Sequence, residues 1–381
     1  MIEWVIGGLI LGTITGLMPG IHPNLIAVVL AGIFTDSTIL IFTTAVTHTF
    51  LNSIPTTYLS IPDAETALSL HPSQEYAKKG RAHEAVILTI IGSLIALVLM
   101  VILSPLLLKI IKPLFKTIST AIPSLLILTA TFLIIRQKSK LMAAGIFLLS
   151  GLLGIIALNT TISEPLTPLF TGLFAIPSII ISSNEKTSKQ KLTGPKLTKG
   201  SFKTILKSLP FGSFFSFLPA VGPAQAIVVQ QQFTKKKSKK DFLILTGCLN
   251  TINIIFSLIM LIELNKARNG AIAVIRDQGF INIPQLSSLF YISLILTLPC
   301  TLIGIGSSRL FLKLKNKINP KTLNNSIICL LIIIVFLLSS TKGILILIIA
   351  SVIGYLPYRY NISKTTLMGS LMIPTIINYL H

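Results

Sequence analysis

An apolar segment interrupted by glycine and proline occurs twice in this chain, 200 positions apart. The first copy reads GTITGLMPGIHPN from Gly12 to Asn24, and the second reads GSFFSFLPAVGPA from Gly212 to Ala224. One glycine and two prolines keep their spacing in both copies: Gly12, Pro19 and Pro23 match Gly212, Pro219 and Pro223. Because proline removes a helical hydrogen bond and glycine permits sharp bends, each copy predicts two short helical arms joined by a break. We therefore expect two related halves.

The rest of the chain has the composition of a membrane protein. Of its 381 residues, 52% are hydrophobic and 11% are charged, against about 25% charged in a soluble domain. Mean hydropathy is +0.84. Apolar runs near the ~20 residues that a membrane-crossing helix needs recur at 85–108, 118–135, 141–158 and 326–340. The short alternating segments of a membrane β-barrel are not visible. The sequence predicts an all-α polytopic membrane protein.

The formal net charge of +21 comes from short loops between the apolar runs. The cluster KKKSKK at 235–240 is typical of a cytoplasmic loop facing an anionic leaflet. Since no separate basic domain is visible, we expect no nucleic-acid partner. The three cysteines lack metal-binding spacing. The N-terminal sequence MIEW lacks the basic start of a removable signal peptide.

The loop charges predict a topology. Spans are expected at about 37–59, 85–108, on either side of 136–140, at 165–182, 241–264, 284–308, 324–340, 343–357 and 365–380. Placing the basic linker 184–204 in the cytoplasm puts 25 of the 32 Lys and Arg residues inside and seven outside, as the positive-inside rule requires. The first repeat is then 1–183 and the second is 205–381. Each is a broken hairpin plus about five transmembrane helices, and the two hairpins enter from opposite sides, as inverted repeats do.

The two breaks are the expected substrate site. Paired interruptions in corresponding positions of two halves are the best sequence-level indication of a transporter's binding site. The helices that start after Pro23 and Pro223 would direct positive dipole ends and free N–H groups at an anion. A purely structural kink is the alternative. The candidate substrate-binding residues here are Gly16, Pro19, Gly20, His22, Pro23, Asn24, Pro219, Gly222, Pro223 and Gln225.

Polar residues inside the spans extend this site. His48 and Asn52 share one helix face, and Asn250 and Asn253 share another. Their side chains can bind a carboxylate or a cation, or they can hold helices together by hydrogen bonds. These two readings stay open here.

Asp63 and Glu65 follow Pro62 at the end of a span. They are the candidate ion-coupling residues, for Na⁺ or a proton. Capping of a short helix is the alternative. A bound Na⁺ is the one cofactor that these residues suggest; we expect no metal site otherwise. The chain has no P-loop, HExxH or GxSxG motif, so we expect neither ATP hydrolysis nor an enzyme.

Several segments, in order, resemble the large membrane permease (TctA-type) of tripartite tricarboxylate transporters, and more closely its shorter archaeal members. They are 16–24, 47–57, 61–68, 80–86, 217–225, 249–253 and 266–270. The resemblance implies uptake of carboxylates driven by an ion gradient, with an extracytoplasmic binding protein and a small membrane subunit. The chain departs from the family where Pro-Gly is replaced by Pro219-Ala220 and Pro62-Asp63, and it lacks an Asn/Gly-rich stretch in the second half. These departures leave the expected fold unchanged, but they mean that the resemblance alone does not identify the transported substrate.

We therefore predict a multi-pass secondary active transporter of the cell membrane. It would move a small organic anion of the carboxylate or tricarboxylate type, coupled to Na⁺ or H⁺, by alternating access at the two hairpins. One alternative is a flippase of a lipid-linked phosphate. A less favoured one is an intramembrane enzyme, which would need His48 close to Asp63. The expected partners are the organic anion and membrane lipid. The binding protein, the small subunit and a homodimer are left open.

Overall fold

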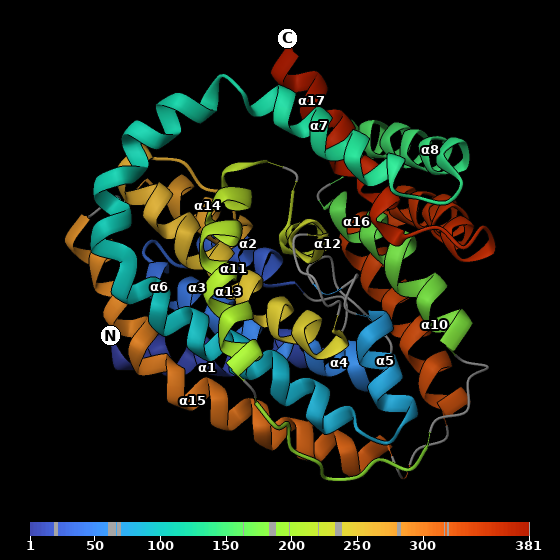
Figure 1. The fold of residues 1–381 in the computed structure, drawn as a ribbon, viewed down its shortest axis with the longest axis horizontal. Helices are drawn as coiled ribbons and strands as arrows, with labels where there is room; N and C mark the ends of the chain where they lie inside the picture. Colours follow the sequence, from blue (N-terminus) through green and yellow to red (C-terminus); the bar gives the residue numbers. More distant parts are fainter. Residues whose placement is uncertain are drawn as a thin grey trace.

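The two predicted breaks separate pairs of helices in the computed structural model (Figure 1). The structure describes the chain except residues 19–21, 60–65, 67–69, 163, 183–187, 198, 220, 233–237, 280–282, 316, 318–319 and 381. Within its helices, the side chains at 25, 70–71, 182, 199, 224–225, 228, 231–232, 320–321 and 323 are also outside this description. The described residues form helices and connections, with no strand among them. The predicted all-α class is confirmed.

The first half begins with the arms of the first hairpin. They are α1 (Ile2–Leu17) and α2 (Pro23–Ile33), and α2 begins at the proline of the break. The predicted span 37–59 is two helices, α3 (Thr38–Leu51) and α4 (Ser53–Tyr58), divided at Asn52, because Pro55 has no N–H to donate to the carbonyl of Leu51. The remaining helices are α5 (Leu70–Lys78), α6 (Ala82–Ser119), α7 (Ile122–Ile135), α8 (Lys140–Leu158), α9 (Leu166–Phe170), the π-helical turn η1 (Thr171–Ala175) and α10 (Ile176–Ser182).

The second half also begins with the arms of a hairpin. Its hairpin is α11 (Lys199–Phe217) and α12 (Pro223–Gln232), so the first arm starts inside the predicted linker. The predicted spans 324–340 and 343–357 correspond to the two parts of α16, which meet at a kink at Ser340. The other elements are α13 (Lys239–Leu264), α14 (Gly270–Asp277), α15 (Ile283–Lys315), α16 (Pro320–Arg359), η2 (Lys364–Met368) and α17 (Gly369–Leu380).

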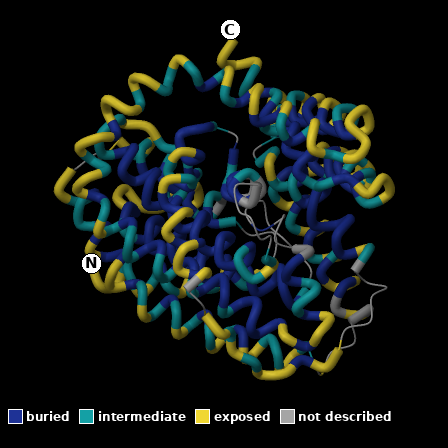
Figure 2. Tube along the Cα trace, viewed as in Figure 1, coloured by how far each residue is buried: buried dark blue, intermediate teal, exposed yellow. Residues whose placement is uncertain are grey.

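Among the described residues, five helices are long and apolar enough to cross a membrane: α6, α8, α13, α15 and the 324–359 part of α16. Helix α13 is almost wholly buried inside the protein, whereas α15 and α16 expose much of their apolar surface (Figure 2). Large side chains such as Leu141, Tyr291 and Leu337 are 70% or more exposed. Apolar side chains directed outward around a buried central helix are expected of a protein whose solvent is lipid.

Helix packing in the first half has a counterpart in the second. Helices α1 and α2 pack on α3, and α11 and α12 pack on α13. Across the halves, α13 packs along α6 and α15 packs along α3. Close approach is permitted by glycine, since a β-carbon at Gly92 of α6 would lie 2.2 Å from the carbonyl oxygen of Ile244, and one at Gly247 of α13 would lie 1.9 Å from that of Thr89. In each half, therefore, the hairpin arms rest on the helix that follows them.

Contacts between loops fall into two separate sets, each joining loops that the charge pattern assigns to one side. The predicted inner set includes Lys239 with Glu75, Lys240 with the Lys196 carbonyl, His83 with Ser308 and Gln137 with Ser363. The predicted outer set includes Lys112 with Glu263, Gln285 with Asp36, Arg268 with Tyr379 and Lys342 with Thr161. This separation agrees with the sequence-based topology.

Candidate functional site

The first hairpin break ends in a histidine cap. His22 lies just before α2, and its imidazole Nδ1 accepts a hydrogen bond from the backbone N–H of Asn24 at 3.3 Å. Pro23, the first residue of α2, has no N–H to satisfy. The predicted residues Pro19 and Gly20 lie outside the described residues. The start of α2 is therefore a helix N-terminus with one of its free N–H groups already bonded.

A buried polar cluster joins the three helices around this break. His48 of α3 is 3% exposed, and its Nδ1 lies 3.2 Å from the hydroxyl of Thr15 on α1. The rings of His48 and His22 are 5.3 Å apart, centroid to centroid. Gly16 is also buried and faces Leu51 of α3, where a β-carbon would lie 2.7 Å away. The first hairpin thus brings together His22 and His48, two of the predicted site residues.

Asn24 connects the first hairpin to the second half. Its side chain contacts α14, where a β-carbon on Gly270 would come 2.4 Å from the Asn24 Nδ2. The Oδ1 atom of Asn24 is buried and has no hydrogen-bond partner among the described residues. An amide oxygen left in this state can accept a hydrogen bond or bind a cation. Gly270 is the last residue of 266–270, one of the segments that resemble the transporter family, and it therefore lies beside the first break.

The second hairpin break is closed around a small cavity. Gly222 and Pro223, at the start of α12, line it together with Ser216 of α11 and Asn253 of α13. Its volume is ≈ 10 Å³, which is at the lower limit for a single water molecule. Pro219 lies in the turn that leads to it, and the side chain of Gln225 lies outside the described set. A carboxylate can enter only if α11, α12 and α13 separate.

Asn250 of α13 is a buried amide. It is 1% exposed, and neither its Oδ1 nor its Nδ2 has a hydrogen bond to any described residue. Leaving a buried amide unsatisfied costs about 1–3 kcal/mol for each group, so such a residue calls for an explanation beyond packing. Asn52, which the sequence aligns with Asn250, is 4% exposed at the α3–α4 turn. Its carbonyl accepts a hydrogen bond from Thr56.

The structure thus places His22, Asn24 and His48 around the first break, and Gly222, Pro223 and Asn253 around the second. Helices α3 and α13, which carry the polar span residues, contact each other between the hairpins. The candidate coupling residues Asp63 and Glu65 lie outside the described residues. Within the described part of the chain, no three His, Cys, Asp or Glu side chains group closely enough to hold a metal ion.

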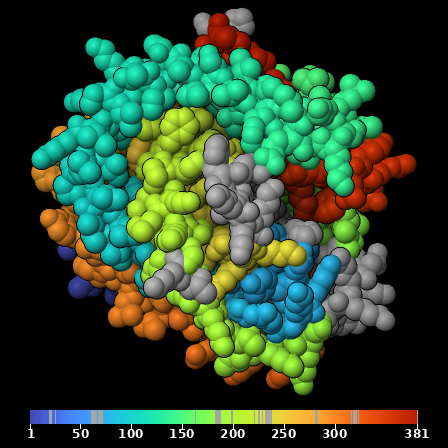
Figure 3. Space-filling view, viewed as in Figure 1, coloured from blue at the N-terminus to red at the C-terminus, as the bar shows by residue number. Residues whose placement is uncertain are grey.

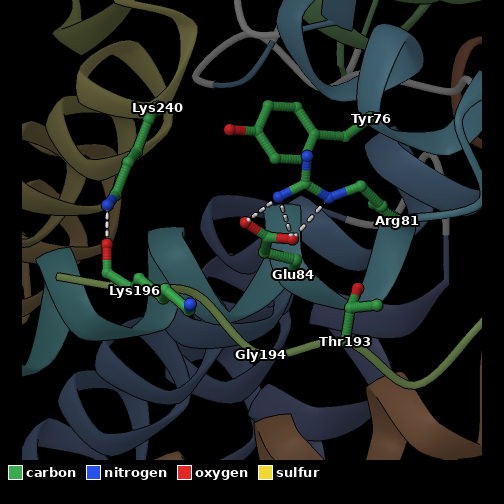
Figure 4. Close-up of a pocket in the computed structure, with 7 residues that line it drawn as sticks. All are labelled: Tyr76, Arg81, Glu84, Thr193, Gly194, Lys196 and Lys240. Carbon is green, nitrogen blue, oxygen red and sulfur yellow. Dashed lines mark hydrogen bonds and ion pairs between the residues drawn. The ribbon is translucent and has the colours of Figure 1, made fainter.

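Sequence reasoning missed a larger, basic pocket away from the hairpins. It has a volume of ≈ 330 Å³ and lies where the 188–197 linker crosses the ends of α5 and α6 (Figure 4). Arg81 and Glu84 form its best-defined pair, with two hydrogen bonds of 2.7 Å. The Lys and Arg residues of the linker and of the α5–α6 turn indicate the topology of the chain. Nothing in the sequence shows that the linker packs against the turn between α5 and α6.

Long apolar helices, two hairpins broken in matching places and buried polar groups beside each break define a polytopic membrane permease. The chain belongs to the tripartite tricarboxylate transporter TctA family, whose model matches residues 2–369. It is also 30% identical, over 395 aligned residues, to Uncharacterized protein MJ1079 of Methanocaldococcus jannaschii, covering 99% of this chain and 98% of that protein. No solved structure matches the chain. The resemblance read from the motifs is confirmed, and the family is one of transporters, not of enzymes.

Proposed function

We propose that this chain carries a small carboxylate, of the tricarboxylate type, across the cell membrane at the two hairpin breaks. The observation that carries the proposal is Asn250, a buried amide with no partner among the described residues, on the helix that supports the second break. An amide of this kind can donate to a carboxylate oxygen or offer its own oxygen to a cation. Family membership supplies the substrate class.

The helix N-termini at Pro23 and Pro223 provide the second part of the anion site. Free N–H groups and the positive dipole end favour a carboxylate close to the axis of each helix. In the first hairpin His22 accepts the Asn24 N–H. A substrate carboxylate would compete with that imidazole for the same donor. We infer that ligand binding at the first break rearranges His22 and the neighbouring His48.

We propose that a Na⁺ or H⁺ gradient drives this transport, as the resemblance to the family implies. Asp63 and Glu65 are the carboxylates that we propose for this role, and Asn24 and Asn250 have amide oxygens suited to Na⁺. Uptake measured under a Na⁺ gradient and under a proton gradient would show which of the two ions is coupled to transport.

Alternating access is the proposed mechanism. The cavity at the second break is too small for a carboxylate, so the structure corresponds to a closed arrangement of that hairpin. The matched packing of α1–α2 on α3 and of α11–α12 on α13 supports two inverted repeats, each able to open toward one side. An extracytoplasmic binding protein and a small membrane subunit are partners that the family suggests. A homodimer stays a proposal.

Uptake in proteoliposomes tests this function. Purified protein would be reconstituted and supplied with labelled citrate, and with a panel of di- and monocarboxylates, under an inward Na⁺ gradient or an inward proton gradient. We expect uptake of at least one carboxylate that disappears when the matching ionophore removes the gradient. Protein-free liposomes and the Asn250→Leu variant are the controls. Uptake that no gradient stimulates, across the whole panel, would contradict the proposal.

A further inference from the structure

The pocket on the predicted cytoplasmic side is built from three separate parts of the chain. The end of α5 and the start of α6 supply Tyr76, Arg81 and Glu84. The linker supplies Thr193, Gly194 and Lys196, and the first turn of α13 supplies Lys240. In the space-filling view, α5, the linker and the start of α13 lie next to one another on one face (Figure 3). Both halves and the segment that joins them therefore meet at this pocket.

The linker wall is held by specific hydrogen bonds. Gln190 is 5% exposed; its Oε1 accepts from the N–H of Ala82 and its Nε2 donates to the carbonyl of Ala77. The N–H of Lys191 donates to the carbonyl of Gly80. Gly80 has φ +74°, and a β-carbon there would lie 2.7 Å from the carbonyl oxygen of Lys189, so glycine is required at this crossing. The pocket wall is part of the fold.

Positive charge exceeds negative charge among the residues that line the pocket. Glu84 is buried and is bound by both arms of the Arg81 guanidinium, which also lies over the ring of Tyr76 at 5.3 Å. Glu84, the carboxylate among the described lining residues, is occupied by Arg81, and the ammonium of Lys240 donates to the carbonyl of Lys196. Nearby, Glu75 pairs with Lys239, and the carboxylate of Asp241 partly offsets the charge of Lys240. The cations Arg81, Lys196 and Lys240 still outnumber the carboxylates Glu84 and Asp241, so the pocket keeps a net positive charge.

Hydroxyl donors complete the lining. The hydroxyl of Thr193 is buried and has no hydrogen-bond partner within the described chain. The phenol of Tyr76 is directed toward the space between Lys240 and the Arg81–Glu84 pair (Figure 4). Lysine ammonium groups, one guanidinium and hydroxyl groups in one concave site are the donors that bind phosphate oxygens. A phosphate ester carries about −1.5 to −2 charges at neutral pH and three strong acceptor oxygens, so it can accept from both ammonium groups and from the hydroxyls at once, which a single carboxylate with two oxygens does less completely.

We propose that this pocket binds a phosphate group, from a phospholipid headgroup or from a soluble phosphorylated molecule. The bound phosphate would be held by Lys196 and Lys240, with Tyr76 and Thr193 as hydroxyl donors. It would connect α13 of the second half to the α5–α6 turn of the first half through the linker. This site is separate from the hairpin breaks and does not depend on the transported substrate.

Binding to purified full-length protein tests the proposal. In nanodiscs of phosphatidylcholine, inorganic phosphate and pyrophosphate would be titrated by calorimetry, with citrate as the competing anion. In a second arm, retention of phosphatidylglycerol during delipidation would be followed by native mass spectrometry. Saturable phosphate or pyrophosphate binding in the first arm indicates a soluble ligand, and retained phosphatidylglycerol in the second indicates a headgroup.

The Lys196→Gln/Lys240→Gln variant is expected to weaken binding, or to lower lipid retention, by roughly ten-fold. The matched control is Lys138→Gln/Lys140→Gln, which removes the same charge from another exposed loop of the predicted cytoplasmic side. Tyr76→Phe/Thr193→Val removes two hydroxyls without changing charge and serves if the lysine variant does not fold. Three results would overturn the proposal: equal losses in pocket and control variants, preference for citrate over both phosphates, or no binding in either arm. Because none of these readouts is transport, failure here leaves the proposed function untouched.

Discussion

Thr47 of α3 lies directly against Gly12 of α1, where a β-carbon would come within 2.5 Å of the Thr47 Cβ. The carbonyl oxygen of Thr44 would be 2.6 Å from the same β-carbon. Gly8 and Gly16 make similar contacts with Thr43 and Leu51, so a stripe of glycines four residues apart faces α3. Small residues at this spacing let membrane helices pack backbone to backbone. The first hairpin arm is positioned by this stripe.

Substitution of Gly12 tests that packing. Gly12→Ala is expected to destabilise the protein by about 1–3 kcal/mol, since neither the Thr44 backbone nor a branched Thr47 can move aside cheaply. The apparent unfolding temperature in detergent would be measured. Gly32→Ala on α2 is the matched control because a β-carbon there meets nothing within 4 Å. It should gain up to about 1 kcal/mol from helix propensity. Equal stability of the two variants would rule out this account of the packing.

The hairpins and most of the spans could be predicted because their signals are local. Proline and glycine mark the breaks beside Pro23 and Pro223, and uninterrupted apolar runs mark α6 and α13. The kink at Ser340 lies where the predicted spans 324–340 and 343–357 adjoin, whereas the division of the span 37–59 at Asn52 was not predicted. Pro55 lies three residues after Asn52 and has no N–H to donate to the carbonyl of Leu51, so the sequence did contain a local signal for this division.

Replacing Asn250 should separate stability from transport. Asn250→Leu has a similar volume and removes a buried amide without partners among the described residues, so we expect a gain of about 1–3 kcal/mol in stability. Carboxylate uptake should fall at least about ten-fold, as expected where a functional residue is kept at a cost in stability. Thermal unfolding and proteoliposome uptake would be measured on the same preparation. A variant that is less stable, or that transports normally, contradicts the role proposed for Asn250.

Ser257 provides the opposite control on the same helix. Its hydroxyl oxygen accepts the N–H groups of Arg268 and Asn269 at 2.9 and 3.0 Å. Ser257→Ala leaves both donors without this acceptor and is expected to lower stability by about 1–3 kcal/mol. Comparing Asn250→Leu with Ser257→Ala therefore tests whether stability rises when a polar group without hydrogen bonds is removed from α13 and falls when a hydrogen-bonded one is removed.

The candidate site was only partly predictable from the sequence. Residue type alone pointed to His22, His48 and Asn250. The contact between the two imidazole rings and the absence of described partners around Asn250 depend on how α1, α3 and α13 pack. The basic pocket at Lys196 and Lys240 depends on the path of the linker, which is fixed by Gln190 and Gly80. No periodicity in the sequence encodes that path.

Glu164 should make stability depend on pH. It lies in the loop between α8 and α9, and burial raises the pKa of its carboxyl above the ordinary value. The folded state therefore binds the proton of this carboxyl more tightly than the unfolded state does. The stabilising contribution is complete below the unfolded pKa and is lost as the pH rises through the higher folded pKa. Glu164→Gln, which mimics the protonated acid, should be slightly more stable than wild type at pH 7. That difference should vanish near pH 4. A difference that grows on acidification would show that the sign is wrong.

Ser340 has the one backbone conformation inside α16 that favours glycine. Its φ of 55° and ψ of −163° lie in a region that is essentially restricted to glycine and costs other residues about 1–3 kcal/mol. Ser340→Gly is expected to raise the apparent unfolding temperature by relieving this strain. Ser339→Gly is the matched control: Ser339 is helical, and its hydroxyl donates to the Glu164 carbonyl at 3.0 Å, so that variant should be less stable than wild type. Thermal unfolding of both variants in one detergent gives the comparison. If Ser340→Gly lowers stability as much as Ser339→Gly does, the two parts of α16 form one continuous helix instead of meeting at a strained corner.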